Sequence, residues 1–296
     1  MTLAWTAEPE RGSAVALRTI GWVARRLGRP CARLLLYPIT LYFFLTAARA
    51  RAASGDYLRR VLVRRPRLID RWRHFHCFAC TILDRVYLLT GGAAGFDVEI
   101  SDPDGLRHRT RSDGGCVLLG AHVGSFDLLR TLAVSDHGIR LKVLMRTEHN
   151  AVVTRFLEAL NPAIAGTVLP VDDIDDVLRL RECLESGHVI ALLADRLLPG
   201  ERSVRCEFLG APAAFPVAPL RLAAALGAPV FLAFGAYRGG RRYDVRFELF
   251  AERLALGRAR RDPAIAAVAQ RFADRLALFV RDAPFNWFNF YPFWPR

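Results

Sequence analysis

The spacing of apolar and polar residues divides the chain near residue 92. Before that point the spacing is helical, with an amphipathic stretch at 15–30 (VALRTIGWVARRLGRP) and further helical patterns between 55 and 89. Gly91 and Gly92 follow the last of these patterns and form a helix stop signal. The sequence therefore predicts a helical region over residues 1–92.

After residue 92, short β-rich runs alternate with helical stretches. The expected strands are FDVEI, CVLLG, LKVLM, HVIALLA, PVFLAFG and YDVRFELF, and the expected helices lie around Leu128, Phe156, Val177, Leu222 and Phe272. Such alternation is typical of an α/β fold. We therefore predict a domain over residues 93–296 with a central mixed sheet flanked by helices, preceded by the helical extension.

An apolar run of fifteen uncharged residues occupies positions 34–48, between Arg33 and Arg49. It is shorter than the roughly 20 residues that cross a bilayer as a helix, and Pro38 interrupts it. Two interpretations stay open. The run either packs into the core of a helical subdomain or lies in a membrane interface as an anchor.

The net charge of +13 is confined to the N-terminal quarter of the chain. Between Arg11 and Arg73 there are fifteen arginines and two acids, Asp56 and Asp70, while the rest of the chain is neutral. Arginines beside an apolar run favour an anionic membrane surface as partner. No zinc-finger or RNP-type signature accompanies them, so a nucleic-acid partner is not expected. The six cysteines are too few and too scattered for a disulfide scaffold, which indicates a reducing compartment.

Candidate chemistry lies in CVLLGAHVGSFDLLR, residues 116–130. His122 follows an apolar strand, Ser125 is placed to cap a helix, and Asp127 falls in the first turn of that helix. A carboxylate there could fix the tautomer of His122 and leave its other nitrogen as a general base. The alternatives are a structural histidine and a carboxylate favoured by the helix N-terminus.

Spacing alone does not select this pair. His108 and Asp113 have the same separation, in a charged, glycine-terminated stretch that we interpret as a solvated turn. The choice between the two pairs therefore depends on their surroundings in the sequence. These favour His122, which lies near Gly124 where a predicted strand is followed by a predicted helix.

The motif GAHVGSFDLLR, taken with the terminal FNWFNFYPFW, resembles the lipid A biosynthesis (lauroyl/myristoyl) acyltransferase family of the lysophospholipid acyltransferase-like superfamily. The likeness continues through LDRVYLL at 83–89, LLADRLLPG at 192–200 and FLGAPAAFPVAPL at 208–220. Three positions depart from the family pattern. Arg196 stands where Gln is more common, Leu209 where a second Phe is more common, and Asp127 where several lipid A enzymes carry Glu.

The resemblance implies a glycerol-3-phosphate acyltransferase-like fold and an O-acyltransferase activity. His122 would act as general base, oriented by Asp127, with direct transfer from an acyl thioester to an acceptor hydroxyl. Four residues would bind substrate, namely Arg146, Asn150, Asp195 and Arg196.

The resemblance also implies an acyl carrier protein or acyl-CoA as donor and a glycolipid of the lipid A type as acceptor. The expected location is the cytoplasmic face of a bacterial inner membrane. Two alternatives stay open: another acceptor, such as an aryl-polyene lipid or a phosphatidylinositol mannoside, and a non-catalytic peripheral lipid-binding protein.

Two further segments have alternative interpretations. HFHCFAC holds His74, His76, Cys77 and Cys80, residue types that bind zinc, but the spacing fits no common site and an apolar helix face explains it. We expect neither metal nor cofactor. The tail at 284–294 has seven aromatic residues in eleven, which either fill the core or form a wall for an acyl chain.

Overall fold

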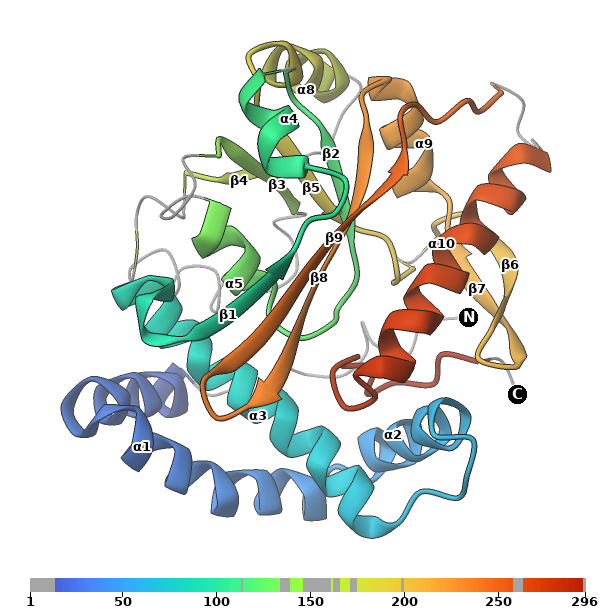
Figure 1. Ribbon diagram of the computed structural model, residues 1–296. Coiled ribbons are helices and arrows are strands. Elements are labelled where there is room, and N and C mark those ends of the chain that lie inside the picture. The colour runs from blue at the N-terminus through green and yellow to red at the C-terminus, as the bar shows by residue number, and fades with distance from the viewer. Residues whose placement is uncertain are drawn as a thin grey trace.

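The computed structural model describes residues 14–112, 114–133, 139–145, 161, 166–170, 175–197, 200–257 and 263–294. A seven-stranded sheet with the order β1-β9-β8-β2-β5-β3-β4 forms its centre (Figure 1). The strands are β1 (Asp97–Ser101), β2 (Val117–Gly120), β3 (Leu141–Met145), β4 (Val168–Pro170), β5 (Val189–Leu193), β8 (Val230–Gly239) and β9 (Arg242–Ala251).

The sheet is mixed and mostly parallel. Every neighbouring pair of strands is parallel except β8 and β9, which form an antiparallel pair joined by a short turn. The predicted α/β class is therefore confirmed. A separate antiparallel hairpin, β6 (Ser203–Phe208) and β7 (Ala211–Pro216), was not anticipated from the strand pattern.

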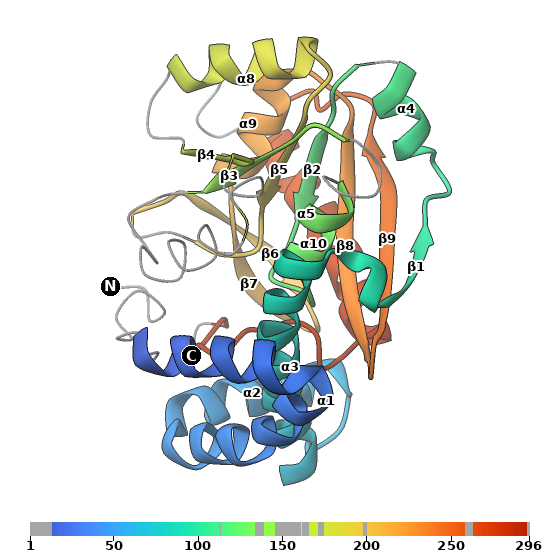
Figure 2. The same cartoon turned by 90° about the vertical axis from the view of Figure 1, so that its left-hand side faces the viewer.

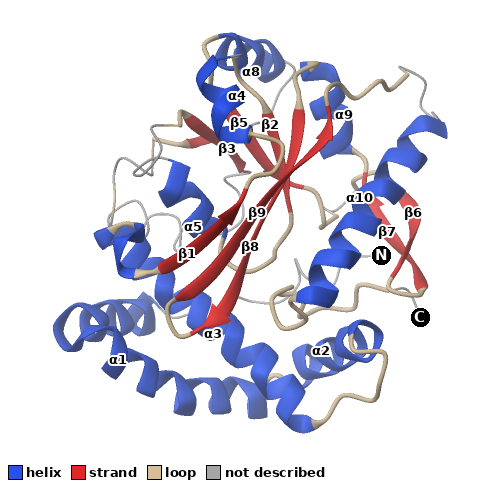
Figure 3. Cartoon of the chain, viewed as in Figure 1, coloured by secondary structure: helices blue, strands red, loops and turns tan. Residues whose placement is uncertain are grey.

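Helices cover both faces of the sheet (Figure 3). The helices that follow the N-terminal region are α4 (Leu106–Ser112), α5 (Phe126–Thr131), α8 (Asp175–Glu185), α9 (Ala218–Leu226) and α10 (Pro263–Asp282). One apolar cluster joins the sheet to α8, α9 and α10, and a second joins its other face to α4 and α5. The two faces of the buried strands thus contribute to separate cores.

The N-terminal region is helical, as predicted. Helices α1 (Ala14–Thr46), α2 (Ala48–Val61) and α3 (Leu68–Gly91) gather at one end of the sheet (Figures 1 and 2). Helix α1 is kinked at Gly28, and Gly92, whose φ of 70° suits glycine, caps the C-terminal end of α3. Both apolar clusters include N-terminal side chains, such as Tyr57 in one and Leu83 in the other.

No single helix in the described part of the chain is long and apolar enough to cross a bilayer. The segments Gly28–Thr46 and Ala48–Val61, which meet at a bend of 95°, reach the length and apolar content of a membrane span only when they are taken together.

One local prediction is wrong, and another concerns residues outside the described part of the chain. The stretch around His108, expected to be a turn, forms α4, because Asp102 accepts hydrogen bonds from the backbone N–H groups of Leu106 (2.7 Å) and Arg107 (3.1 Å) and so caps the helix. His108 is exposed, as a solvated position should be. The helix expected around Phe156 lies outside the described residues.

Candidate active site

The loop that carries His122 is fixed by backbone contacts to β8 and to the C-terminal tail. Strand β2 ends at Gly120, and the N–H of Gly124 donates to the carbonyl of Asn286 (2.8 Å). Gly124 has a φ of +57°, and a Cβ there would lie 1.7 Å from the carbonyl oxygen of Gly235. Only glycine allows the backbone to come this close to Gly235, so Gly124 sets the turn that places His122.

Ser125 caps the following helix, as predicted from the sequence. Its Oγ accepts a hydrogen bond from the backbone N–H of Leu128 at 3.2 Å, and Asp127 lies in the first helical turn. The strand, turn and helix start all fall where the pattern of residues 116–130 places them.

Asp195 holds His122 at two points. Its Oδ1 lies 2.8 Å from Nδ1 of His122, and its Oδ2 accepts the backbone N–H of His122 at 3.0 Å. Asp195 follows β5, which is the parallel neighbour of β2, so the carboxyl ends of two central strands bring the pair together.

The C-terminal tail completes the surroundings of this pair. The indole Nε1 of Trp287 donates to Oδ2 of Asp195 at 2.9 Å, and the N–H of Phe288 donates to the carbonyl of His122 at 2.9 Å. Trp287 is 1% exposed. The tail therefore fills the core, as one of the two interpretations expects, and it also lies against the His122–Asp195 pair.

The electrostatics keep Asp195 ionised and His122 neutral. Burial alone would raise the pKa of Asp195, but His122, Arg196 and the Trp287 indole together lower it to about 2. Burial lowers the pKa of His122, and the positive charges of Arg196 and Arg85 lower it further, against the opposing effect of Asp195.

These contacts define the tautomer of His122. An ionised carboxylate only accepts hydrogen bonds, so Nδ1 carries the proton and Nε2 keeps its lone pair. Within the described residues Nε2 makes no hydrogen bond, and the side chain is 32% exposed. The ring is thus prepared to accept a proton at Nε2.

Asp127 does not take the place that sequence reasoning gave it. Its buried carboxylate pairs with Arg85 of α3 and, at 3.5 Å, with Nη1 of Arg130 one helical turn on. The first-turn position directs the carboxylate toward these guanidinium groups, while Asp195 takes Nδ1 of His122. The His-x4-Asp spacing therefore does not describe the hydrogen bond that orients the imidazole.

The other expected site residues divide into two groups. Asp195 and Arg196 lie beside His122, and Nη2 of Arg196 donates to the carbonyl of Phe288 at 2.8 Å. Arg146 and Asn150 lie outside the described residues. Arg85 and Trp287 were not singled out from the sequence, although Arg85 lies in the motif LDRVYLL and Trp287 in the motif FNWFNFYPFW.

The histidines and cysteines of HFHCFAC do not converge. His74 bonds Ser54 and the Trp287 carbonyl, and His76 lies 3.3 Å from the Thr40 hydroxyl. In the described part of the chain, no group of three or more His, Cys, Asp or Glu side chains is arranged to hold a metal ion.

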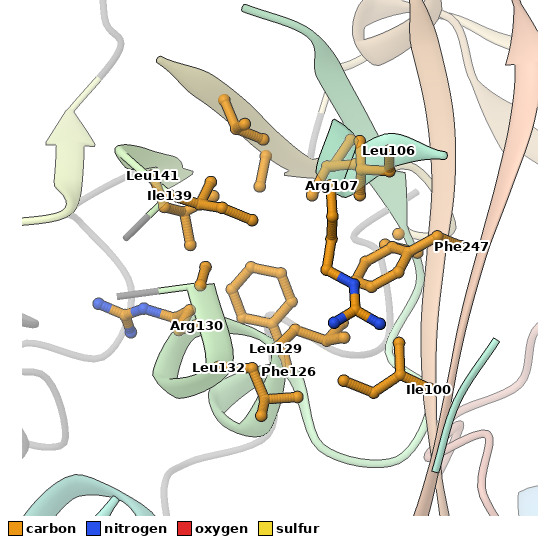
Figure 4. Close-up of a pocket in the computed structure, with 16 residues that line it drawn as sticks. Ile100, Leu106, Arg107, Phe126, Leu129, Arg130, Leu132, Ile139, Leu141 and Phe247 are labelled. Carbon is orange, nitrogen blue, oxygen red and sulfur yellow. The ribbon is translucent and has the colours of Figure 1, made fainter. Parts of the chain in front are cut away.

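A mostly apolar pocket lies between α4, α5 and the sheet, at the end of the strand that precedes His122 (Figure 4). Gly120, two residues before His122, lines it, as do Phe126 and Leu129 of α5 and Ala233 of β8. The guanidinium of Arg130 points away from it (Figure 4). Its lining is mostly apolar and includes Arg107, and its volume is about 30 Å³, much less than a whole fatty acyl chain fills.

The mixed sheet and the histidine held by a buried carboxylate define an α/β protein equipped for general-base chemistry. The profile of the family described as bacterial lipid A biosynthesis acyltransferase matches residues 85–296, more than half of the chain. The chain therefore belongs to the bacterial lipid A biosynthesis acyltransferase family, and the resemblance seen in its motifs is confirmed.

Two curated relatives are similar to part of the chain. Both are named phosphatidylinositol mannoside acyltransferase, from Mycobacterium tuberculosis strains ATCC 25618 / H37Rv and CDC 1551 / Oshkosh. Each is 29% identical over 182 residues, which are 61% of this chain and 54% of the relative. The chain thus spans about half the length of these relatives.

Proposed function

We propose that the protein is a membrane-associated O-acyltransferase that moves a fatty acyl group from a thioester to a hydroxyl of a glycolipid. The observation that carries the proposal is the neutral His122 ring, held at Nδ1 by Asp195 and unbonded at Nε2 among the described residues. Membership of an acyltransferase family supports the same reaction. A purely lipid-binding protein would have no need of this arrangement.

The reaction needs one base that later acts as an acid. Nε2 of His122 takes the proton of the acceptor hydroxyl while its oxygen attacks the thioester carbonyl carbon. The tetrahedral intermediate then collapses, the carbon–sulfur bond breaks, and the departing sulfur takes the proton from Nε2. The products are an ester and a free thiol. Asp195 stabilises the imidazolium that forms in between.

Positive charge around His122 suits an anionic substrate. Arg85 and Arg196 are close enough to lower the pKa of His122, and both acyl carrier protein and acyl-CoA bring phosphate groups with the thioester. Arg146 and Asn150 stay proposed as substrate-binding residues. Asp127, as the partner of Arg85 and Arg130, would hold these cations in place rather than orient the imidazole.

We propose that the acyl chain enters at the pocket beneath α5, because mostly apolar side chains line it beside the end of β2; with a volume of about 30 Å³, the pocket would have to widen to receive the chain. For the acceptor, the family description favours a lipid A-type sugar, and the names of the two relatives favour a mannosylated phosphatidylinositol. Both are glycolipids with free hydroxyls, and the test below includes both.

Membrane contact is proposed through the outer face of α1. Its exposed apolar side chains are Leu34, Leu35, Tyr37, Leu41, Tyr42 and Leu45. This face lies in the arginine-rich quarter of the chain, which suits an interfacial helix on anionic lipid. The cytoplasmic face of a bacterial inner membrane fits this arrangement and a thioester donor.

A thioester-turnover assay tests the proposal. Purified protein is mixed with an acyl carrier protein thioester or acyl-CoA, and with a lipid A precursor or a phosphatidylinositol mannoside. We expect free thiol and acylated glycolipid to form in equal amounts with one of these acceptors and to be lost in His122→Ala. Absence of thiol release from folded protein with every combination would contradict the proposal.

A further inference from the structure

Beneath the candidate site, a buried histidine connects the N-terminal helices to the tail. His74 of α3 is fully buried, with Nδ1 2.9 Å from the Ser54 hydroxyl of α2 and Nε2 2.9 Å from the Trp287 carbonyl oxygen. Neither the proposed reaction nor a metal site makes use of His74.

The hydrogen-bond roles of this histidine follow from its partners. A carbonyl only accepts, so Nε2 of His74 carries the proton and donates to Trp287. Nδ1 of the neutral ring then accepts a hydrogen bond from the Ser54 hydroxyl. The ring is held in one tautomer from both sides, opposite to the tautomer of His122.

Packing also holds Trp287 in place. The ring of Tyr57, on α2, lies edge-on to Trp287 with centroids 5.0 Å apart, and Phe208 of β6 packs on it at 5.3 Å. Its indole Nε1 donates to Asp195, and Asp195 holds His122. A continuous series of contacts therefore runs from Ser54 through His74 and Trp287 to the base.

We infer that His74 and Trp287 are positioning residues, which hold Asp195 against His122 and make the N-terminal helices part of the catalytic support. The inference rests on the proposed function, because it assigns His122 as the base. It also gives the helical region a role besides membrane contact. Outer partners of metal-bound histidines contribute about ten- to a hundredfold to metal affinity or activity, and we expect an effect of the same order here.

Four substitutions test the series. Trp287→Phe keeps a smaller aromatic ring but loses the donor to Asp195, and His74→Leu loses the donor to the backbone carbonyl of residue 287. We expect each to lower kcat by about ten- to a hundredfold with little change in KM. His74→Gln keeps a donor and should recover part of the loss. Ser54→Ala, the smallest change, should lower kcat in the same direction by less.

Two readouts separate positioning from a general loss of stability. The pKa of His122, followed by NMR in folded protein, should shift in Trp287→Phe and in His74→Leu. In the double variant, His74→Leu should add no more than about twofold to the effect of Trp287→Phe, because it acts through that residue.

His76 supplies a matched control on the same helix. It stacks on Trp72 with centroids 4.7 Å apart and contacts Thr40 rather than the tail. His76→Leu should leave kcat and the pKa of His122 unchanged.

The inference is overturned if folded Trp287→Phe keeps the wild-type kcat and the wild-type pKa of His122. Independent, multiplying effects of the two substitutions would also overturn it. If the wild-type protein transfers no acyl group, the proposed function fails, whereas the pKa comparison still decides whether His74 and Trp287 act on His122.

Discussion

Asp195 accepts hydrogen bonds from both the backbone N–H and the Nδ1–H of His122, although the two residues are 73 positions apart. Two neighbouring parallel strands bring them together, because β2 ends just before His122 and β5 just before Asp195. Asp127, five positions after His122, has the spacing expected of an orienting carboxylate, but the residue that orients the ring is Asp195, which follows another strand.

The first prediction compares the two carboxylates. Asp195→Asn should lower turnover by up to about 10⁴-fold, because an amide does not stabilise the imidazolium and can select the wrong tautomer. Asp127→Asn should act mainly on stability, since it weakens the ion pairs with Arg85 and Arg130. Turnover and thermal midpoints of both variants distinguish these effects. Equal loss of turnover at unchanged stability would return Asp127 to the role of orienting residue.

The second prediction concerns the two histidines that share one spacing. His122→Ala should lower turnover by about 10²–10⁴-fold, the scale of general-base catalysis. His108→Ala removes an exposed side chain from α4 and should change turnover little. A folded His122→Ala protein with near-full transfer activity would end the assignment of His122 as base.

The third prediction concerns acyl-chain length. Ala233→Leu adds volume to a wall of the apolar pocket beneath α5. We expect kcat/KM for a long saturated chain to fall by about fourfold for each methylene that no longer fits, about 0.8 kcal/mol each. Shorter chains should be affected less. An unchanged ratio between long and short donors would place the acyl chain elsewhere.

The fourth prediction concerns the membrane face of α1. Leu34, Leu41 and Leu45 are 68%, 49% and 64% exposed on one side of the helix, so their replacement by Gln should not disturb the fold. Each substitution should weaken binding to anionic vesicles by roughly tenfold if that leucine enters the acyl layer. Leu178→Gln and Leu278→Gln change exposed leucines on α8 and α10 and serve as controls. Equal loss from the controls would argue against α1 as the anchor.

The sequence predicted the elements of the site better than its contacts. Strand, turn and helix around His122 follow from local signals, namely an apolar run, Gly124 and the Ser125 cap. The hydrogen-bond partner of His122 does not follow from local signals. Register and strand order bring β2 and β5 together, and no local pattern encodes that order. An acid directly after an apolar strand was the available signal for Asp195.

Local charge also misled the interpretation in one place. The arginine-rich stretch at 106–112 has the composition of a solvated turn, yet Asp102 caps it from outside the stretch and a helix forms. Distant contacts also fix Trp287 beside Asp195. They come from His74 and Tyr57, which lie more than two hundred residues earlier in the chain and could not be paired with Trp287 from local patterns.

The last prediction concerns the stability of the fold in acid. Burial lowers the pKa of His74 from 6.5 to about 4, so between these values the unfolded chain binds a proton that the folded chain excludes. Stability is therefore lost as pH falls through this window. From pH 7 to pH 5 the contribution is about 2 kcal/mol.

His74 shares this pH window with His76 and His122, because burial lowers their pKa values as well. Asp195 and Asp70, whose pKa values are lowered from 3.8 to about 2, contribute mainly below about pH 5. His74→Gln should therefore reduce, without abolishing, the dependence of the unfolding free energy on pH between 7 and 5, measured by denaturant titration. His108→Gln, which changes an exposed histidine, should keep the wild-type slope. The same slope in His74→Gln as in the wild type would mean that His74 accepts a proton in the folded protein, and its bond to the Trp287 carbonyl would no longer require a neutral ring.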